Sequence, residues 1–351
     1  MSFDGINAMS ETVRALTAHG KGILAADESH GTIGRRFTAI GVENTPENRR
    51  RYRQLLFTTP GIADALGGVI LFDETIRQQA DDGTPFPKLL TALGIVPGIK
   101  VDAGAKPLAG APGETVTEGL DGLRERLAEY RGLGARFAKW RAVIEIGEGR
   151  PSRYCLEVNA HALARYAALC QEAGIVPIVE PEVLMDGSHT IEQCFEATEA
   201  TLDHVFRALR DHRIVLEAML LKPNMVVSGA KCPRQAGVDE VAEATVRCLR
   251  RTVPAALPGV MFLSGGQSPE RATQHLNAMN ALPGPRPWVL SFSFARALQA
   301  PAMDTWRGST AAVQAAQQAF LRRSRLVAAA REGRYTPAME QAGAATGPAR
   351  S

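Results

Sequence analysis

Short apolar runs that end in polar or charged residues recur along the chain, and helix-like segments separate most of them. Each run is rich in Val, Ile and Leu and too short for most helices, so it predicts a strand buried on both faces of a parallel sheet. Eight such runs follow one another roughly 30 to 45 residues apart: ILAA (from Ile23), GGVILFDE (from Gly67), VPGIKVD (from Val96), ARFAKWRAVIEI (from Ala135), GIVPIVEPE (from Gly174), AMLLKPNM (from Ala218), GVMFLSGGQS (from Gly259) and PWVLSFSFARAL (from Pro287).

Helix-start signals occupy the intervals between these runs. They are a Ser or Thr cap followed by proline in the first turn, or a capping box. They occur at Thr45-Pro46, at Thr190 with Gln193, where a long helix should run to about Arg210, and at Ser268-Pro269. Amphipathic patterns near the chain ends predict two more helices, one from Ser10 to His19 and one from Ser309 to about Arg331.

The eight strand-then-helix units predict a single (β/α)8 barrel, an α/β TIM barrel with additional terminal helices, over residues 1–335. No linker-like change of composition divides these residues. Residues 336–351 (TPAMEQAGAATGPARS) are small and rich in Gly and Ala, and they are expected to form a flexible tail. A doubly wound open sheet is the structural alternative, but no G-x-G-x-x-G follows the first strand.

Composition narrows the class of partner. Hydrophobic residues make up 45% of the chain and charged residues 22%, as in ordinary soluble globular proteins. A net charge of +3 is too small to indicate nucleic acid or an anionic membrane as a partner. No apolar run is long enough to span a bilayer, and the first 20 residues hold no apolar core flanked by basic residues, so we expect no membrane span and no secretory signal.

The cysteines and histidines indicate a reduced compartment and no metal site. The five cysteines are odd in number and widely spaced, a pattern that favours reduced thiols in the cytoplasm over disulfides or a zinc site. The seven histidines are scattered and form no cluster with ligand spacing. We therefore expect no bound metal.

The polar residues at the ends of the predicted strands suggest a common site. In a (β/α)8 barrel the carboxyl ends of the strands open onto one face, where catalysis takes place. Any one of these residues could simply be a solvated strand end, but lysines, arginines and carboxylates from several strands would meet there. The predicted site consists of Asp27, Lys100, Lys139, Arg141, Glu180, Glu182, Lys222, Ser264, Gly265, Gly266, Ser293 and Arg296.

Lys222 is the expected nucleophile of this site. It follows an apolar run, and Pro223 stops further strand pairing, so Lys222 lies at a strand end. A free lysine has a pKa of about 10.4, so holding one as the neutral amine at pH 7 costs roughly 4–5 kcal/mol. A second ammonium about 4 Å away contributes roughly 4 kcal/mol at an effective dielectric of about 20. Lys139, together with burial, is therefore predicted to make Lys222 a nucleophile.

A neutral amine in such a pocket adds to a ketone and forms an iminium, which acts as an electron sink without a metal or other cofactor. Glu180 or Glu182 is placed to move protons on and off the carbinolamine oxygen. Asp27, from the opposite side of the ring, is a candidate base for carbon–carbon cleavage. The segment LSGGQSP (from Leu263) supplies backbone N–H groups and a helix start, so it and the loop with Arg296 predict a phosphate site.

The chain resembles the class I fructose-bisphosphate aldolases, the metal-independent, Schiff-base-forming kind. The similarity runs in order from about residue 7 to about residue 345, on motifs that include GKGILAADES, GGVILFDET, FAKWR, GIVPIVEPE, LLKPNMV, FLSGGQS and FSFARALQ. It implies a (β/α)8 barrel, in agreement with the count of strands. It further implies a homotetramer that reversibly cleaves fructose 1,6-bisphosphate into dihydroxyacetone phosphate and glyceraldehyde 3-phosphate, in glycolysis and gluconeogenesis.

The resemblance also implies residue roles, carried over motif by motif. Lys222 in LLKPN would form the Schiff base, with Glu180 as the acid and base for the carbinolamine and Glu182 hydrogen-bonding nearby. Asp27 in LAADES would take the C4 hydroxyl proton, helped by Lys139. The remaining residues would bind substrate: Lys100 and Arg141 on the sugar, Ser264, Gly265 and Arg296 on the 1-phosphate, and Ser29, Thr32 and Arg36 toward the other phosphate.

Two departures from the family pattern affect the expected mechanism. Animal members end in a tyrosine that assists enamine protonation, whereas the last tyrosine here is Tyr335 and the last residues are Ala-Arg-Ser. We therefore expect enamine protonation, by Glu180 or water, to be slower than carbon–carbon cleavage. The aromatic–glycine pair before the phosphate-binding arginine is Phe294-Ala295 here, and the alanine can supply the same backbone N–H.

Two functional alternatives stand beside this interpretation. One is a Schiff-base aldolase that prefers fructose 1-phosphate or sedoheptulose 1,7-bisphosphate. The other is a barrel that binds a ligand without catalysis.

Overall fold

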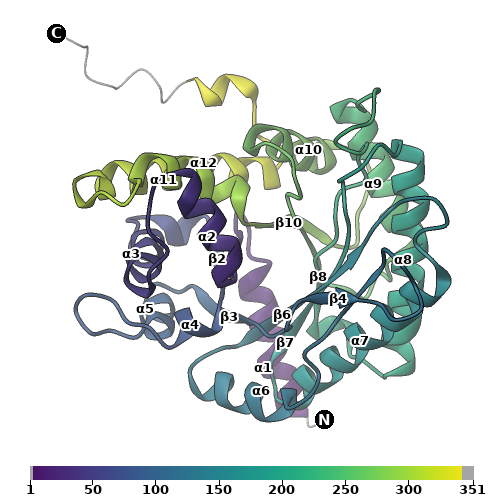
Figure 1. Cartoon of the computed structure of the whole chain (residues 1–351), viewed down its shortest axis with the longest axis horizontal. Coiled ribbons are helices and arrows are strands. Elements are labelled where there is room, and N and C mark those ends of the chain that lie inside the picture. The colour runs from purple at the N-terminus through teal and green to yellow at the C-terminus, as the bar shows by residue number, and fades with distance from the viewer. Residues whose placement is uncertain (1–2, 342–351) are drawn as a thin grey trace.

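The computed structural model describes residues 3–341, and they form a closed barrel of eight parallel strands (Figure 1). Around the barrel the strand order is β1, β10, β9, β8, β7, β6, β3, β2, which closes back on β1. The predicted (β/α)8 barrel is confirmed and the open-sheet alternative is wrong. The strands are β1 (Gly22–Ala26), β2 (Leu66–Leu71), β3 (Val96–Lys100), β6 (Phe137–Ile144), β7 (Val176–Val183), β8 (Leu220–Leu221), β9 (Gly259–Phe262) and β10 (Val289–Phe294).

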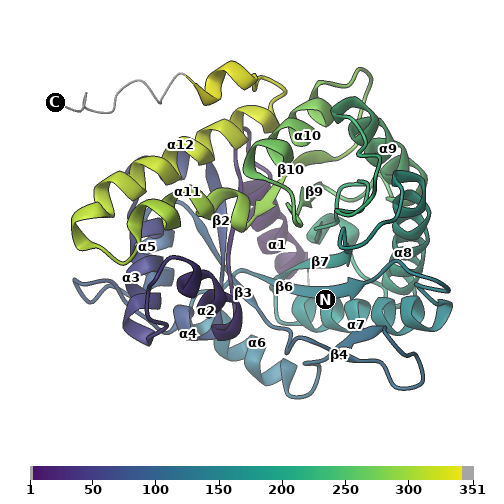
Figure 2. The same ribbon diagram turned by 45° about the horizontal axis from the view of Figure 1, so that its top comes forward.

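Helices surround the barrel, with α7, α8 and α9 side by side along one flank and α11 packed on α12 at another (Figure 2). The Thr190–Gln193 capping box is present, and the side chains of Thr45 and Ser268 accept backbone N–H groups at the helix starts predicted for them. The helices are α2 (His30–Ala39), α3 (Pro46–Phe57), α4 (Asp73–Ile76), α5 (Phe86–Ala92), α6 (Leu123–Gly132), α7 (Arg153–Glu172), α8 (Ile191–Asp211), α9 (Val238–Thr252), α10 (Pro269–Ala281), α11 (Arg296–Trp306) and α12 (Val313–Arg331).

The structure corrects the predicted helix near the amino terminus. Helix α1 spans Phe3–Leu16 and not residues 10–19, because the chain leaves the helix at Thr17 and turns before Gly20, whose φ is +71°. The Thr17 hydroxyl donates to the Val13 carbonyl oxygen at 2.8 Å, which satisfies one of the last acceptors of the helix.

The predicted carboxyl-terminal helix starts a few residues late. A 3-10 turn at Thr310–Ala312 precedes α12, which ends at Arg331 as expected. Within the expected tail, Pro337–Glu340 forms another 3-10 turn, and residues 342–351 lie outside the described residues. None of the helices in residues 3–341 is both long and apolar enough to cross a membrane.

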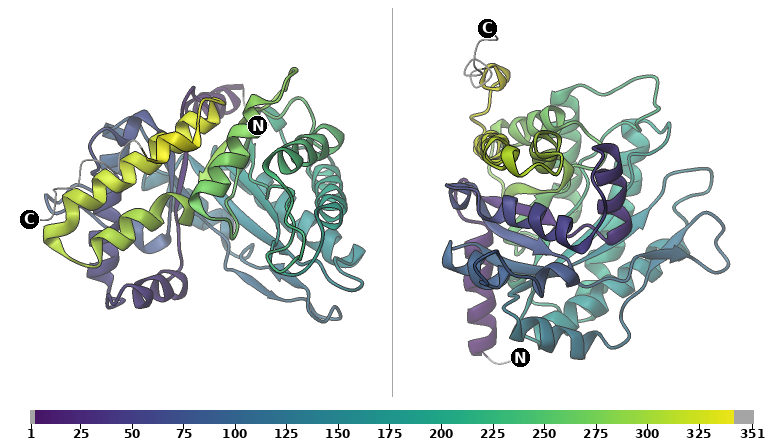
Figure 3. Two further views of the ribbon diagram at one scale, coloured as in Figure 1. Left: turned by 90° about the horizontal axis from the view of Figure 1, so that it is seen from above. Right: turned by 60° about the vertical axis from the view of Figure 1, so that its left-hand side comes forward.

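The barrel interior is apolar at its amino end and polar at its carboxyl end. Helix α1 packs across the amino ends of β2, β3 and β7, and its Leu16 joins a buried cluster with inward residues such as Ile23, Phe137 and Met261. Figure 3 shows α1 running down to the amino terminus, away from α12. Because the amino end is filled in this way, the charged side chains of the interior gather at the other end.

Along β6 the side chains alternate between the interior and the helices, as they must in a pleated strand. Trp140 is fully buried among the outer core residues and stacks on Tyr166 of α7, with ring centroids 5.5 Å apart. Lys139 and Arg141, on either side of it, line the inside instead. A short antiparallel hairpin that the sequence pattern did not indicate, β4 (Ala105–Pro107) with β5 (Thr115–Thr117), follows β3.

Candidate active site

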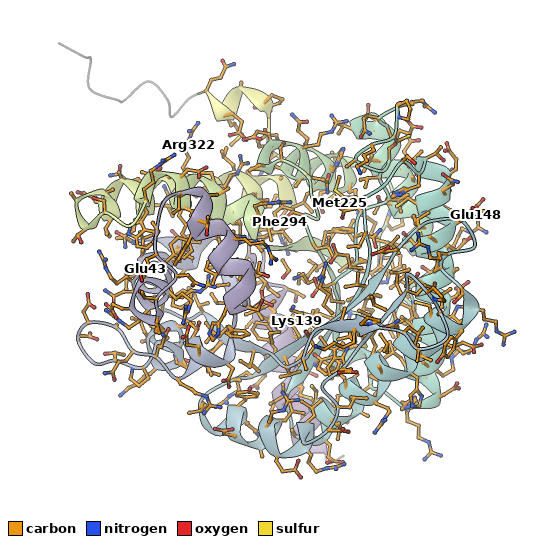
Figure 4. The ribbon with its side chains drawn as sticks, viewed as in Figure 1. Glu43, Lys139, Glu148, Met225, Phe294 and Arg322 are labelled. Carbon is orange, nitrogen blue, oxygen red and sulfur yellow. The ribbon has the colours of Figure 1, made fainter. Side chains whose placement is uncertain are left out.

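A cavity of about 370 Å³ opens at the carboxyl ends of the barrel strands. Lys139 lies near the middle of the molecule, whereas Glu148 lies at its edge (Figure 4). Of the residues predicted for the site, Gly266 does not line this cavity, and its backbone N–H donates to Met185 Sδ at 2.9 Å. The cavity brings together all the others: Asp27, Ser29, Thr32, Arg36, Lys100, Lys139, Arg141, Glu180, Glu182, Lys222, Ser264, Gly265, Ser293 and Arg296.

Two long strands and the end of a short one position the central charges. β6 and β7 pair in parallel over eight successive positions, with Arg141 opposite Glu180 and Val143 opposite Glu182. β8 holds only Leu220 and Leu221, and the backbone N–H of Lys222 then donates to Val179 of β7 at 2.8 Å. This last bond holds Lys222 beside β7 even though Pro223 ends the strand.

Four buried charged side chains form a connected cluster at the cavity floor. Lys222 Nζ lies 3.1 Å from Glu180 Oε1, and Lys139 Nζ lies 3.2 Å from Glu180 Oε2 and 2.7 Å from Asp27 Oδ2. Each of these residues is at most 8% exposed. Glu180 therefore sits between the two lysines, with one oxygen facing each.

This arrangement differs from the expected direct pairing of two ammonium groups. The charged group that contacts Lys222 is Glu180, and Lys139 acts from the far side of the same carboxylate. Glu182, which the resemblance placed beside the nucleophilic lysine, has its ion pair with Arg141. Within residues 3–341 no hydrogen bond of ordinary geometry reaches Glu180 Oε2, so this oxygen keeps free acceptor capacity.

The cluster keeps its carboxylates ionised. Burial works to raise the pKa of Asp27, but attraction to Lys139 and Lys222 outweighs it and holds the pKa below the ordinary value of 3.8. The same balance, with the same two lysines, lowers the pKa of Glu180. Burial works to lower the pKa of Lys139, but Asp27 and Glu180 raise it above its ordinary value, so Lys139 stays protonated.

These shifts lead us to expect a pH-dependent contribution of Asp27 to stability. Because the folded-state pKa lies below 3.8, ionised Asp27 stabilises the fold above that pH, and this stabilisation is lost as the pH falls below it. Urea unfolding between pH 3 and pH 7 measures this. The free energy of unfolding should fall less at acidic pH for Asp27→Asn than for the unsubstituted chain. Below pH 4, the slopes of unfolding free energy against pH should differ between the two chains by an amount approaching about 1.4 kcal/mol per pH unit. Parallel pH profiles for the two chains would contradict the expectation.

One end of the cavity is built from the loops after β9 and β10. Arg296, the first residue of α11, donates from Nη2 to the Gly265 carbonyl oxygen at 3.1 Å, so the two loops touch. Gly265 has a φ of +57°, a conformation that favours glycine. Ala295 has a negative φ of −105°, so the alanine found here in place of glycine causes no left-handed strain. The buried Ser293 hydroxyl has no hydrogen-bond partner within residues 3–341 and faces the cavity.

Another part of the cavity wall is one face of α2. Ser29, Thr32 and Arg36 are three and four residues apart, so they share this face. Ser29 caps the helix in an extended conformation, and its hydroxyl donates to Thr32 Oγ1 at 3.2 Å. Two hydroxyls at a helix start and a basic side chain two turns later suit an anion.

Sequence reasoning missed two carboxylates on the cavity wall, Asp102 and Glu28. Asp102 Oδ1 lies 3.3 Å from Lys100 Nζ, and its Oδ2 accepts the Arg141 backbone N–H at 3.3 Å. Glu28 directly follows Asp27 and Asp102 lies two residues after Lys100, and this closeness to predicted site residues is the signal that could have found them.

The donor sets of the described chain do not resemble a metal centre. Among residues 3–341, no group of three or more His, Cys, Asp or Glu side chains is arranged to hold a metal ion. The five cysteines are buried free thiols.

A family model described as "Fructose-bisphosphate aldolase class-I" matches residues 8–348. The chain belongs to the class I fructose-bisphosphate aldolases. The predicted family and enzyme class, a carbon–carbon lyase acting on a sugar phosphate, are confirmed.

Relatives within the class I fructose-bisphosphate aldolases come from distant organisms. A "Probable fructose-bisphosphate aldolase class 1" from Xanthomonas axonopodis pv. citri is 60% identical over 91% of this chain and 96% of its own. "Fructose-bisphosphate aldolase 6, cytosolic" from Arabidopsis thaliana is 56% identical over 90% of this chain and 88% of its own. A solved structure of fructose-bisphosphate aldolase from Plasmodium falciparum, in complex with TRAP and a small molecule inhibitor, is 48% identical with a TM-score of 0.94, covering 96% of this chain and 97% of that one.

Proposed function

We propose that this chain reversibly cleaves fructose 1,6-bisphosphate into dihydroxyacetone phosphate and glyceraldehyde 3-phosphate through a Schiff base on Lys222, in glycolysis and gluconeogenesis. The observation that carries the proposal is the buried cluster in which one carboxylate, Glu180, contacts both Lys222 and Lys139. A lysine held against a proton acceptor at the bottom of a polar cavity is what amine addition to a ketone requires.

The first half of the reaction uses Lys222 and Glu180. Lys222 gives a proton to Glu180 Oε1, 3.1 Å away, and the neutral amine adds to the C2 carbonyl carbon of the substrate. Glu180 returns this proton to the carbinolamine oxygen and then relays a second one to it from the carbinolamine nitrogen. The oxygen leaves as water, and the nitrogen lone pair completes the iminium. Lys139, which stays protonated, limits the charge that builds up around Glu180 during these transfers.

The second half uses Asp27. Its carboxylate takes the proton of the C4 hydroxyl, the electrons of the C3–C4 bond move into the iminium to form an enamine, and the aldehyde leaves. Tyr335 does not line the cavity and its hydroxyl donates to Glu340 at 3.0 Å. We therefore assign protonation of the enamine carbon to water, directly or relayed by Glu180, while Asp27 releases its proton to solvent. Hydrolysis of the iminium, the reverse of the first half, then frees Lys222 and releases dihydroxyacetone phosphate.

Two separate parts of the cavity wall would give the substrate its direction. Ser264, Gly265 and Arg296 would hold the 1-phosphate, and the α2 face with Ser29, Thr32 and Arg36 would hold the 6-phosphate. Lys100 and Arg141 would contact the sugar hydroxyls between them, and the free hydroxyl of Ser293 supplies one more donor at the 1-phosphate end.

Comparing kcat/KM on fructose 1,6-bisphosphate, fructose 1-phosphate and sedoheptulose 1,7-bisphosphate tests the proposal. The first should be cleaved most efficiently, and a chelator should cause no loss because the iminium supplies the electron sink. A higher value for either of the other sugars would establish the alternative specificity. No turnover of any of them, with no adduct after borohydride treatment, would indicate a binding protein.

We also propose that the chain works as a cytoplasmic homotetramer. Five buried free thiols and a relative described as cytosolic support the compartment. The resemblance to the class I family supports the assembly. Sedimentation equilibrium should give the mass of four 37.6 kDa chains, and the mass of a monomer would refute the tetramer.

A further inference from the structure

Glu28 follows the proposed base Asp27 in the chain but takes no part in the lysine cluster. Its Oε1 accepts hydrogen bonds from Arg36 and, at 2.8 Å, from Gln299 Nε2. Its Oε2 accepts from Arg53 Nη2 at 2.7 Å. Both carboxylate oxygens are thus occupied by side chains from three different helices, α2, α3 and α11.

Of these partners, only Arg36 reaches the cavity. The Arg36 side chain is 23% exposed and forms part of the cavity wall. Arg53 is 2% exposed and Gln299 is fully buried, and neither lines the cavity. Glu28 is therefore the side chain that connects both of them to Arg36.

Glu28, Arg36 and Arg53 together carry more positive than negative charge, and the excess lies on the cavity side. Burial works to raise the pKa of Glu28, but Arg53 and Arg36 outweigh it and lower the pKa, so the carboxylate is ionised. One carboxylate faces two guanidinium groups. Since Arg53 is buried, the uncompensated charge is presented at Arg36, on the α2 face that begins with Ser29 and Thr32.

The hydrogen bonds fix where that charge is presented. A free arginine side chain has many rotamers, and ordering it on binding has an entropic cost. Gln299 Nε2 donates both to Glu28 Oε1 and, at 2.7 Å, to the Ala25 carbonyl oxygen of β1, which ties the carboxylate to the barrel. With its other oxygen bonded to Arg53, Glu28 has one conformation open to it and holds the Arg36 guanidinium in place before substrate arrives.

We propose that Glu28, Arg53 and Gln299 are positioning residues that hold Arg36 ready for the phosphate distant from Lys222, and that they thereby set the preference for ketose bisphosphates over ketose 1-phosphates. This inference rests on the proposed function, which places the 6-phosphate at the α2 face. Glu28, Arg53 and Gln299 are called the Glu28 group below.

The ratio of kcat/KM for fructose 1,6-bisphosphate to that for fructose 1-phosphate measures the effect, because only the first sugar carries the distal phosphate. In Arg53→Met and in Gln299→Met this ratio should fall roughly tenfold, the size expected when one charge-assisted hydrogen bond is misplaced. The loss should appear as a higher KM for the bisphosphate. The kcat on fructose 1-phosphate should stay within about twofold, since the lysine cluster is untouched.

Arg49→Met is the matched control. Arg49 lies one turn before Arg53 on α3 and forms a two-bond ion pair with Glu74 at 2.6 and 2.7 Å, but neither residue lines the cavity. Loss of this ion pair in Arg49→Met should lower the melting temperature and leave the kcat/KM ratio of the two sugars unchanged. A merely structural role for Arg53 would give the same result as this control.

A double substitution tests whether the group acts through Arg36. Arg36→Met alone should lower the ratio, and adding Gln299→Met or Arg53→Met to it should cause no further fall. If Arg53→Met does not fold, the milder Gln299→Met decides the question.

The outcomes distinguish failure of the proposed function from failure of the positioning role. No turnover of either sugar by the unsubstituted chain would refute the proposed function itself. A second outcome is turnover of both sugars, with a kcat/KM ratio that Arg36→Met lowers while the folded Gln299→Met and Arg53→Met chains leave it unchanged. That result would overturn the positioning role alone. A ratio insensitive to Arg36→Met would overturn the assignment of the distal phosphate to α2, and the positioning role with it.

Discussion

Replacing Lys222 with methionine is expected to lower kcat/KM on fructose 1,6-bisphosphate by at least about 10⁴-fold, because the covalent intermediate needs its amine. The other two lysines of the cavity have carboxylate partners of their own: Asp102 for Lys100, and Asp27 and Glu180 for Lys139. Methionine has a similar length and no charge, and Glu180 retains Lys139 at 3.2 Å, so the carboxylate is not left without a cation. The substituted chain should therefore fold. Treating it with dihydroxyacetone phosphate and borohydride should give no covalent adduct by mass spectrometry, whereas the unsubstituted chain should carry one on Lys222.

Lys231→Met is a control for this substitution. Lys231 is exposed, lies in the loop after β8 and does not line the cavity. Its replacement should leave both cleavage and the adduct unchanged. Continued cleavage by Lys222→Met, or an adduct mapped to a different lysine in the unsubstituted chain, would refute the assigned nucleophile.

Replacing Asp27 with asparagine should separate the two halves of the reaction. Cleavage of fructose 1,6-bisphosphate should fall about 10²- to 10⁴-fold, the usual contribution of a general base. Schiff-base formation with dihydroxyacetone phosphate should persist, because Lys222 and Glu180 keep their contact at 3.1 Å. The measurement pairs a cleavage assay with borohydride trapping on the same preparation.

Asp73→Asn serves as the comparison for the Asp27 substitution. Asp73 also follows a barrel strand, but it bonds Arg77 and Tyr130 outside the cavity. It should cleave at the normal rate. If Asp27→Asn lost the trapped adduct together with cleavage, Asp27 would be needed for the iminium itself and not only for breaking the carbon–carbon bond.

The barrel could be predicted from sequence because each strand is an apolar run set off by turn and cap residues. The capping box at Thr190 and Gln193 is a local signal, and it is present as predicted. The hairpin of β4 and β5 left no such signal, since it is short and lies largely at the surface. The bounds of α1 were missed for a related reason, because a turn of three residues separates the helix end from the glycine that was taken to end it.

The site could be predicted as a set of residues but not as a set of contacts. Closure of the barrel brings every strand end to one rim, so position in the chain was enough to select residues such as Lys100, Glu180 and Arg296. Which carboxylate would stand between the two lysines depends on side-chain geometry. The contacts within the Glu28 group could not be predicted from the sequence. Arg53 is one of several arginines in ENRRRYR, and its partner Gln299 lies 246 residues further along the chain.

The pairing of β6 with β7 over eight positions has a consequence for how this chain can change. Inserting or deleting one residue inside either strand would exchange the two faces beyond that point. On β6 the large aromatic ring of Trp140 would then enter the substrate cavity, and Lys139 and Arg141 would be driven into the layer beneath the helices. We therefore expect insertions to be tolerated in the largely exposed turn between β4 and β5, residues 109–113, and to abolish folding and catalysis together within β6 and β7.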